Sequence, residues 1–118
     1  NTAKIEVETG RHSLDLVGKS IGGGKMVIFE LLGFDVNISG DFPSYFIFYN
    51  FNEKNKKDLS KKIDEIFGEK KVSVNYSSSI LEGVNLVVVE AQDILEKETL
   101  SKFDKLEYIN EIKFANRL

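Results

Sequence analysis

Two stretches of the chain, residues 45–49 and 86–89, are apolar at every position. Successive side chains of a β-strand point to opposite faces of the sheet, so a strand without alternation has to be buried on both faces. Residues 72–77 and 111–114 do alternate apolar and polar side chains, which is typical of strands at the edge of a sheet. The pattern therefore predicts a sheet with residues 45–49 and 86–89 in its centre.

Two helices are predicted between these strands. Residues 53–67 carry apolar side chains at helical spacing and are followed by Gly68, a residue that commonly ends helices. The second predicted helix covers residues 94–106, with Asp93 as its N-cap and Glu96 at the spacing of a capping box. The apolar faces consist of Leu59, Ile63, Ile66 and Phe67 in the first helix and Leu100, Phe103 and Leu106 in the second.

With strands over residues 44–51, 72–80, 84–91 and 109–115, the order is β-α-β-β-α-β. Right-handed crossovers convert this order into a ferredoxin-like sheet with the first and third strands central. The fold class is therefore α+β. Helices cover one face of such a sheet, and the apolar second face needs another cover. The candidates are the N-terminal residues, a second copy of the chain, or a missing part of a larger protein.

The N-terminal third has a different organisation. Residues 2–9, 12–17, 26–31 and 34–38 read as short strands separated by glycine-containing turns, which predicts an antiparallel meander. The stretch 39–43 breaks this pattern and holds the only proline. We place a boundary there, which gives a β module over residues 1–42 and a second domain over residues 43–118. The abrupt start at Asn1 in strand context suggests a fragment.

Composition excludes several kinds of site. The chain has no cysteine, so it can supply neither a thiol nucleophile nor the thiolate ligands of a metal cluster. His12 is the only histidine, which excludes a multi-histidine metal site. The net charge of −3 argues against general binding to nucleic acid, and no stretch is long and apolar enough for a membrane span or resembles a signal peptide. We expect a cytoplasmic protein without a nucleic-acid or membrane partner.

The glycine stretch Gly18–Lys25 invites comparison with a phosphate-binding loop. That motif needs Gly-x4-Gly-Lys followed by Ser or Thr. In one register Met26 stands at the last position, and in the other Ser13 replaces the first glycine. Two alternatives stay open from the residues alone. The stretch is a wide hairpin loop or bulge, or its backbone N–H groups form a small nest for an anion or carboxylate together with Lys19, Ser20 and Lys25.

Three other patterns have plain structural explanations. The lysines of residues 54–62 alternate with acidic residues, which is typical of a solvated helix face. The aromatic strand 45–51 is typical of a core, because RNA-recognition sheets also need aromatic residues in a strand corresponding to 83–91, which has none. The serines of 77–79 read as the polar end of an edge strand.

Four blocks of the sequence form one continuous pattern: Asn1-Thr2, Val17-Gly18-Lys19-Ser20-Ile21-Gly22-Gly23-Gly24-Lys25, Leu32-Gly33-Phe34-Asp35-Val36 and Ser39-Gly40-Asp41-Phe42-Pro43. Together they resemble the regulatory region of bacterial iron–sulfur L-serine dehydratases, in the β subunit or in the fused single chain. In that family a β module that binds the allosteric substrate precedes an ACT domain, a ferredoxin-like ligand-binding fold. The resemblance extends over essentially the whole chain.

The resemblance implies a regulatory fragment without activity of its own. Its parent would convert L-serine to pyruvate and ammonia with a 4Fe–4S cluster held in the catalytic part. The implied partners are the catalytic domain or α subunit, a second copy bound through the ACT domain, and L-serine as effector. No residue of this chain is expected to be catalytic or to bind a metal. The implied effector-binding residues are Asn1, Ser20, Gly22, Gly23, Gly24 and Lys25.

One departure keeps other functions open. ACT domains usually place glycine and proline in the turn between the first strand and the first helix, where effectors bind. Here the turn is Asn50-Phe51-Asn52-Glu53-Lys54-Asn55, without either residue. A dimerising ACT module that binds no effector is one alternative. The other is the regulatory end of a phosphoglycerate dehydrogenase, since some of those enzymes carry the same substrate-binding module.

Overall fold

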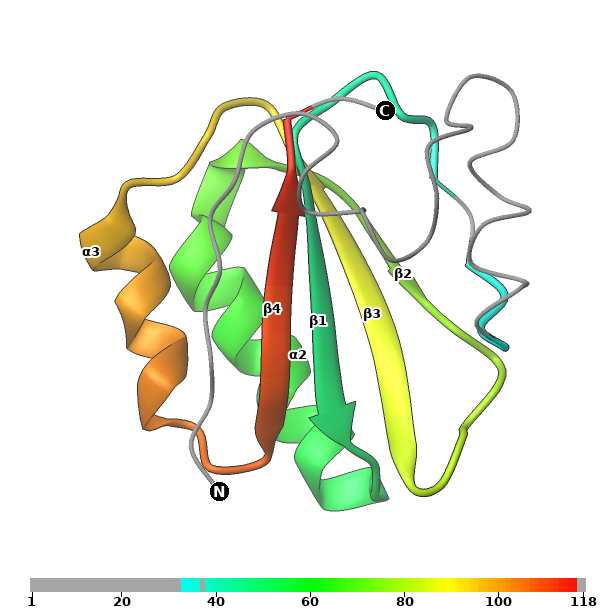
Figure 1. Cartoon of the computed structure of the whole chain (residues 1–118). Coiled ribbons are helices and arrows are strands. Elements are labelled where there is room, and N and C mark those ends of the chain that lie inside the picture. Colours follow the sequence, from blue (N-terminus) through cyan, green and yellow to red (C-terminus); the bar gives the residue numbers. More distant parts are fainter. Residues whose placement is uncertain (1–32, 37, 117–118) are drawn as a thin grey trace.

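A computed structural model describes residues 33–36 and 38–116 of the chain (Figure 1). The predicted strands over residues 2–9, 12–17 and 26–31 lie outside the described residues. The helices and strands are β1 (Ser44–Asn50), α2 (Glu53–Phe67), η3 (Gly68–Lys70), β2 (Lys71–Tyr76), β3 (Val84–Ala91), α3 (Lys97–Leu100), η4 (Ser101–Lys105) and β4 (Ile109–Ala115).

The four strands form one antiparallel sheet in the order β2-β3-β1-β4 (Figure 1). Ile47, in the middle of β1, is paired with Val87 of β3 on one side and with Ile112 of β4 on the other. The two strands without apolar–polar alternation are therefore the central ones, as the sequence predicts. The described part of the chain is α+β, with its helices on one face of the sheet.

Helix α2 confirms the prediction from helical spacing, since it begins at Glu53 and ends at Phe67. Its N-cap is Asn52, whose side-chain oxygen accepts a hydrogen bond of 2.6 Å from the backbone N–H of Asn55. At the other end Gly68 has a φ of +57° and a ψ of −133°, a backbone conformation that residues with a Cβ rarely adopt. The chain can therefore leave the helix sharply and enter β2.

The second helix starts later than the sequence suggests. Its α-helical turn is α3, which continues as the 3₁₀ helix η4, and the N-cap is Glu96 without a side-chain hydrogen bond. The predicted cap at Asp93 is wrong. The backbone N–H of Leu95 instead donates a hydrogen bond of 2.8 Å to Tyr45 Oη, and the Leu95 side chain is buried. This bond to β1 ties the preceding residues to the sheet before the helix can begin.

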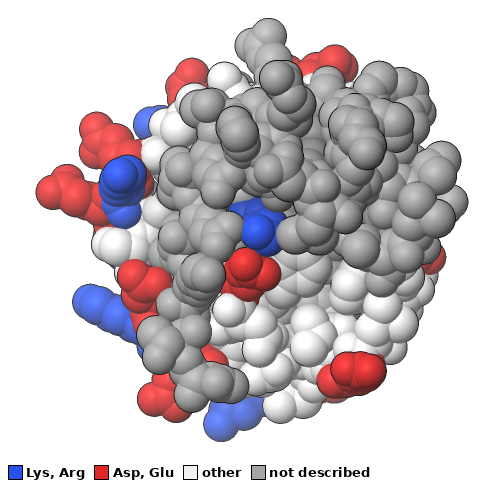
Figure 2. Space-filling model, in the orientation of Figure 1, with Lys and Arg blue, Asp and Glu red and all other residues white. Residues whose placement is uncertain are grey.

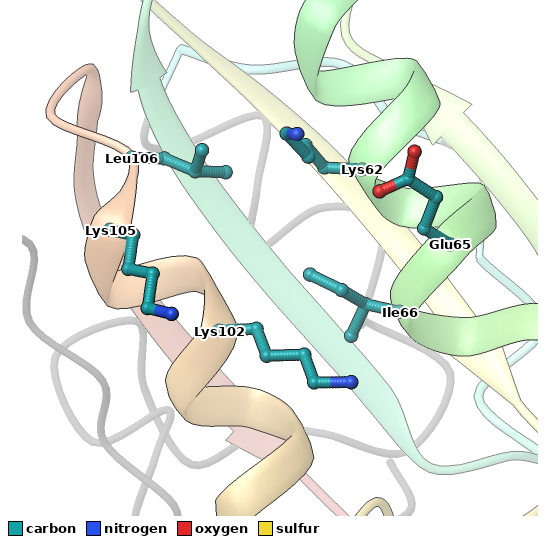
Figure 3. A pocket seen from close by; sticks show the side chains of 6 residues that line it. All are labelled: Lys62, Glu65, Ile66, Lys102, Lys105 and Leu106. Atoms are coloured by element: carbon teal, nitrogen blue, oxygen red, sulfur yellow. The ribbon is translucent and has the colours of Figure 1, made fainter.

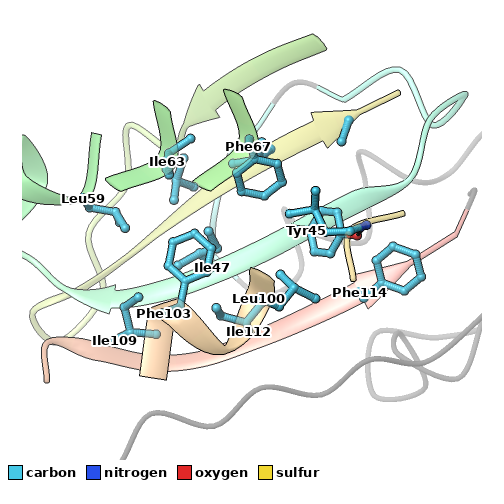
Figure 4. Packing of buried hydrophobic residues seen from close by; sticks show 14 of the residues in the cluster. Tyr45, Ile47, Leu59, Ile63, Phe67, Leu100, Phe103, Ile109, Ile112 and Phe114 are labelled. Carbon is cyan, nitrogen blue, oxygen red and sulfur yellow. Dashed lines mark hydrogen bonds between the residues drawn. The ribbon is translucent and has the colours of Figure 1, made fainter. Parts of the chain in front are cut away.

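The main core lies between the sheet and its helices (Figure 4). Tyr45 packs edge-on against Phe67 of α2, with ring centroids 5.3 Å apart, and lies 4.8 Å from the ring of Phe114 in β4. Phe103 anchors η4 in the same cluster and is fully buried. The aromatic residues of β1 are thus core residues, as predicted.

The other face of the sheet is covered by the segment that precedes β1. Phe34, Val36 and Ile38 are buried against an apolar surface that includes Phe46 and Val88. The alternating burial of this segment fits the sequence pattern, but residues 34–36 and 38 form no strand, so that prediction is wrong. The segment packs onto this sheet face, where the sequence pattern requires an apolar cover.

Candidate functional site

The residues predicted to bind an effector are all outside the described part of the structure. These residues are Asn1, Ser20, Gly22, Gly23, Gly24 and Lys25. The structure therefore neither brings them together nor separates them. Two features within the described residues bear on function: the turn between β1 and α2, and the attachment of the segment before β1.

The turn between β1 and α2 is held by hydrogen bonds within the chain. The backbone N–H of Asn50 donates to the carbonyl of Tyr108, and that of Phe51 donates to the carbonyl of Gly83, each at 2.7 Å. The Asn55 side-chain amide donates to the carbonyl of Asn50 at 2.9 Å. Asparagine side chains and long-range backbone bonds thus stabilise this turn in place of glycine and proline. These donors are already engaged within the protein.

A lysine-lined hollow of about 570 Å³ lies beside this turn. Three of its lining residues lie on one face of α2 at helical spacing: Lys54, Lys57 and Lys61. Tyr108 contributes the opposite side, and its hydroxyl donates a hydrogen bond of 2.7 Å to Asp58 Oδ2. The hollow is open and positively charged, so it can attract an anion but does not enclose one.

Tyr108 remains a neutral hydrogen-bond donor. Burial raises the pKa of its phenol, and the hydrogen bond to the Asp58 carboxylate raises it further. Burial is also the first cause of the raised pKa of Tyr45 and Tyr49 in the core. These phenols therefore serve as hydrogen-bonding core residues, and none is shifted toward the ionised form that a general base needs.

Asp35 attaches the segment before β1 to the end of β2. Its Oδ1 accepts hydrogen bonds of 3.0 Å from Ser77 Oγ and from the backbone N–H of Ser78, and Ser78 Oγ bonds to Oδ2. The Ser78 and Ser77 hydroxyls lower the pKa of the carboxyl to about 2. Strand β2 ends at Tyr76 and not at residue 80, because the serines that follow turn toward Asp35.

Glu90 of β3 attaches the same segment at a second point, Ser39. This glutamate is 4% exposed at the end of β3, and its Oε2 accepts hydrogen bonds from Ser39 Oγ at 2.7 Å and from the Ser39 backbone N–H at 3.1 Å. Its Oε1 accepts from Ser73 Oγ at 2.7 Å. Burial acts to raise the pKa of the carboxyl, but the hydrogen bonds from Ser39 and Ser73 outweigh it, and the pKa is lowered.

Sequence reasoning missed this pair of attachments, although one signal was present. Glu90 follows directly after the apolar run 86–89, and a charge at the end of a central strand needs partners. The bonds of residues 77–79 to Asp35 could not be predicted, because Asp35 is 42 residues or more away in the sequence. Two carboxylates and the serines that bond to them now define the polar contacts between the sheet and the segment before β1.

The described residues contain no candidate metal site and no candidate membrane-spanning helix. Among residues 33–36 and 38–116, no group of three or more histidine, cysteine, aspartate or glutamate side chains could hold a metal ion. In the same part of the chain, none of the helices combines the length and hydrophobicity needed to cross a bilayer. On the face shown in Figure 2, acidic and basic side chains are mixed, and neither sign forms a continuous patch among the described residues.

The described residues form a small α+β unit built on an antiparallel sheet. Helices pack on one face of the sheet, and the segment before β1 packs on the other. The chain is similar to a protein named "Probable L-serine dehydratase, beta chain", from Bacillus subtilis (strain 168). The two are 46% identical over 50 residues, which are 42% of this chain and 23% of the relative. No family model and no solved structure matches the chain. The similarity supports a relation to that subunit.

Proposed function

We propose that this chain is part of the regulatory region of an iron–sulfur L-serine dehydratase β chain and has no catalytic activity of its own. The observation that carries the proposal is the 46% identity over 50 residues with a protein named as such a β chain. The four sequence blocks quoted above support the same family. The aligned residues are 23% of the relative, so the parent activity, the conversion of L-serine to pyruvate and ammonia, is part of the proposal.

Residues 43–118 are proposed to form an ACT-like, ferredoxin-like domain. Strands and helices follow in the order β-α-β-β-α-β, and β1 begins at Ser44, directly after Pro43. The strand order β2-β3-β1-β4 has the first and third strands central, which is the arrangement that right-handed crossovers produce. Residues 1–42 are proposed to form the preceding substrate-binding β module.

The dehydration chemistry is assigned to another part of the parent enzyme. A 4Fe–4S cluster would be held by thiolates of the catalytic domain or α subunit, because this chain contains no cysteine. The proposed partners are that catalytic part and, through the ACT-like domain, a second copy of the chain. We expect all of these to be cytoplasmic.

L-Serine is the proposed effector, at a site formed by the N-terminal module. Its contacts are assigned to Asn1, Ser20, Gly22, Gly23, Gly24 and Lys25. Serine can change activity only if it binds one state of the assembly better than another. The attachments at Asp35 and Ser39 join the last residues of this proposed module to the sheet, so they supply a route by which a change in the module reaches the ACT-like domain.

Calorimetry tests the binding site. L-Serine is titrated into a longer β chain that includes the residues preceding Asn1, and into its Asn1→Ala variant, with D-serine as the control ligand. We expect saturable binding of L-serine that the substitution weakens at least about tenfold. Absence of binding, or binding that Asn1→Ala leaves unchanged, would contradict the assignment.

A second function is favoured by the turn between β1 and α2. Its backbone donors at Asn50 and Phe51 are bonded within the chain, which supports an ACT-like domain that dimerises without binding an effector at this turn. Sedimentation equilibrium tests the dimer. A monomer at high protein concentration would exclude this second function, and it would leave serine binding in the calorimetric experiment unaffected.

A further inference from the structure

A second hollow, of about 260 Å³, lies between α2 and η4, away from the turn after β1 (Figure 3). One wall is formed by α2, with Lys62, Glu65 and Ile66. The opposite wall comes from η4 and the residue after it. Its lining residues there are Lys102, Lys105 and Leu106. Three lysines from two elements that are some 40 residues apart in the sequence thus surround one space.

The regular geometry of the two elements explains this arrangement. A 3₁₀ helix has three residues per turn, so Lys102 and Lys105 project on the same side of η4, one above the other. Lys62 and Ile66 are four residues apart and share one face of α2. The lysines therefore face the hollow because of their positions in the two helices.

The walls of the hollow are fixed by the core. Ile66 and Leu106 are half-buried and pack against the main core cluster, so they form an apolar floor. Phe103 is fully buried between the two η4 lysines in sequence and holds that helix against the sheet. On the other side, Ile63 anchors α2 next to Lys62.

The positive charge of the hollow is only partly compensated by the described residues. No ion pair joins Lys62, Lys102 or Lys105 to another described residue, whereas the nearby Lys71 pairs with Asp64. Glu65 is the one acidic residue in the lining. The chain as a whole carries a net charge of −3, so the positive charge of this hollow is opposite in sign to the net charge of the chain.

We propose that this hollow binds a small organic anion that carries at least two acidic groups, either carboxylates or phosphates. Ammonium groups on opposite walls can contact separate acidic groups of one ligand. The apolar floor suits the carbon skeleton between the acidic groups. The site is open to solvent, so we expect a dissociation constant on the order of 1 mM. It is independent of the L-serine site proposed above.

The experiment measures amide chemical shifts of the 118-residue chain during titration with citrate or with pyrophosphate. Sodium chloride at matched ionic strength controls for general screening. We expect saturable shifts at Ile66 and Leu106 with at least one of the two anions. The anion that binds more tightly separates the carboxylate source from the phosphate source.

Three variants sharpen the test. Lys102→Gln/Lys105→Gln should weaken binding about tenfold, and Lys70→Gln/Lys97→Gln, which removes two exposed lysines outside the lining, should change it by less than about twofold. Glu65→Gln removes the single negative charge and should tighten binding about threefold. All of these side chains are exposed, so folding is retained. The proposal is overturned if neither anion gives saturable shifts at the hollow, or if both double variants weaken binding equally.

Discussion

Replacing Ser73 by alanine tests whether the buried carboxylate of Glu90 fastens the segment before β1. Ser73 Oγ donates a hydrogen bond of 2.7 Å to Glu90 Oε1, and Glu90 is 4% exposed. The other carboxylate oxygen keeps its two bonds from Ser39. The substitution therefore removes one charge-assisted bond and leaves the rest of the attachment in place.

The expected loss of stability in Ser73→Ala follows from the kind of hydrogen bond that is removed. A hydrogen bond to an ionised group contributes about 1.5–3 kcal/mol to stability, more than a bond between neutral groups, because the buried charge is otherwise poorly solvated. Ser73 lies on an edge strand and is half-buried, which favours the lower part of this range. We expect Ser73→Ala to lower the free energy of unfolding by about 2 kcal/mol and the melting temperature by roughly 8 °C.

Urea unfolding of four proteins measures this contribution. The set is the wild type, Ser73→Ala, Glu90→Gln and the double variant. If the two side chains act through their mutual hydrogen bond, the double-mutant cycle gives a coupling energy of at least about 1 kcal/mol. An additive double variant would show that Ser73→Ala acts by another route.

The pH dependence provides a second test. The pKa of Glu90 is lowered in the folded protein, so the contribution of its carboxylate is present above the ordinary value of 4.5 and is lost as the pH falls through the lower, folded value. The difference between wild type and Ser73→Ala should therefore be constant near neutral pH and shrink in acid. The reasoning is refuted if that difference is below about 0.5 kcal/mol at neutral pH, or if it is unchanged in acid.

Three further substitutions give separate tests by urea unfolding. The pKa of Asp35 is lowered to about 2, so its contribution is present above 3.8 and lost as the pH falls toward 2; Asp35→Ala should remove this part of the acid dependence. A Cβ at Gly68 would have no atom within 4 Å, so Gly68→Ala should cost about 1–2 kcal/mol through its positive φ alone. Phe103→Ala leaves a cavity beneath η4 and should cost about 3–5 kcal/mol; a cost below about 1 kcal/mol would contradict the packing described.

The sheet order and α2 could be predicted because their signals are local. Residues 45–49 and 86–89 lack alternation, and burial on both faces follows from that pattern alone. The apolar residues of 53–67 recur at helical spacing, and Gly68 supplies the predicted stop, whereas the N-cap Asn52 was found only in the structure. In each case neighbouring residues decide the structure, so one sequence is enough.

The start of the second helix and the segment before β1 could not be predicted, because distant residues decide them. Tyr45 Oη binds the N–H of Leu95 across 50 residues and delays the helix. Asp35 reaches Ser77 across 42 residues, which holds residues 34–36 against the sheet face without strand pairing. Periodicity shows which side chains are buried, but it does not show what covers them.

The candidate binding sites differ in whether the sequence predicts them. The predicted contacts of L-serine, which include Asn1 and Lys25, stay predictions because they are outside the described residues. The hollow between α2 and η4 was not predicted, because it combines Lys62 with Lys102 and Lys105, which become neighbours only when the two helices pack. The lysine pattern of residues 54–62 alone indicated a solvated helix face.

The most direct measurement of the proposed regulatory role is the initial rate of the intact parent enzyme as a function of L-serine concentration, with and without Asn1→Ala in the β chain. We predict that the variant keeps its maximum rate within about twofold while its dependence on L-serine concentration changes, because Asn1 is proposed to contribute to sensing and not to chemistry. Loss of the maximum rate with an unchanged dependence on L-serine concentration would contradict this role. An enzyme unaffected in both would contradict it as well.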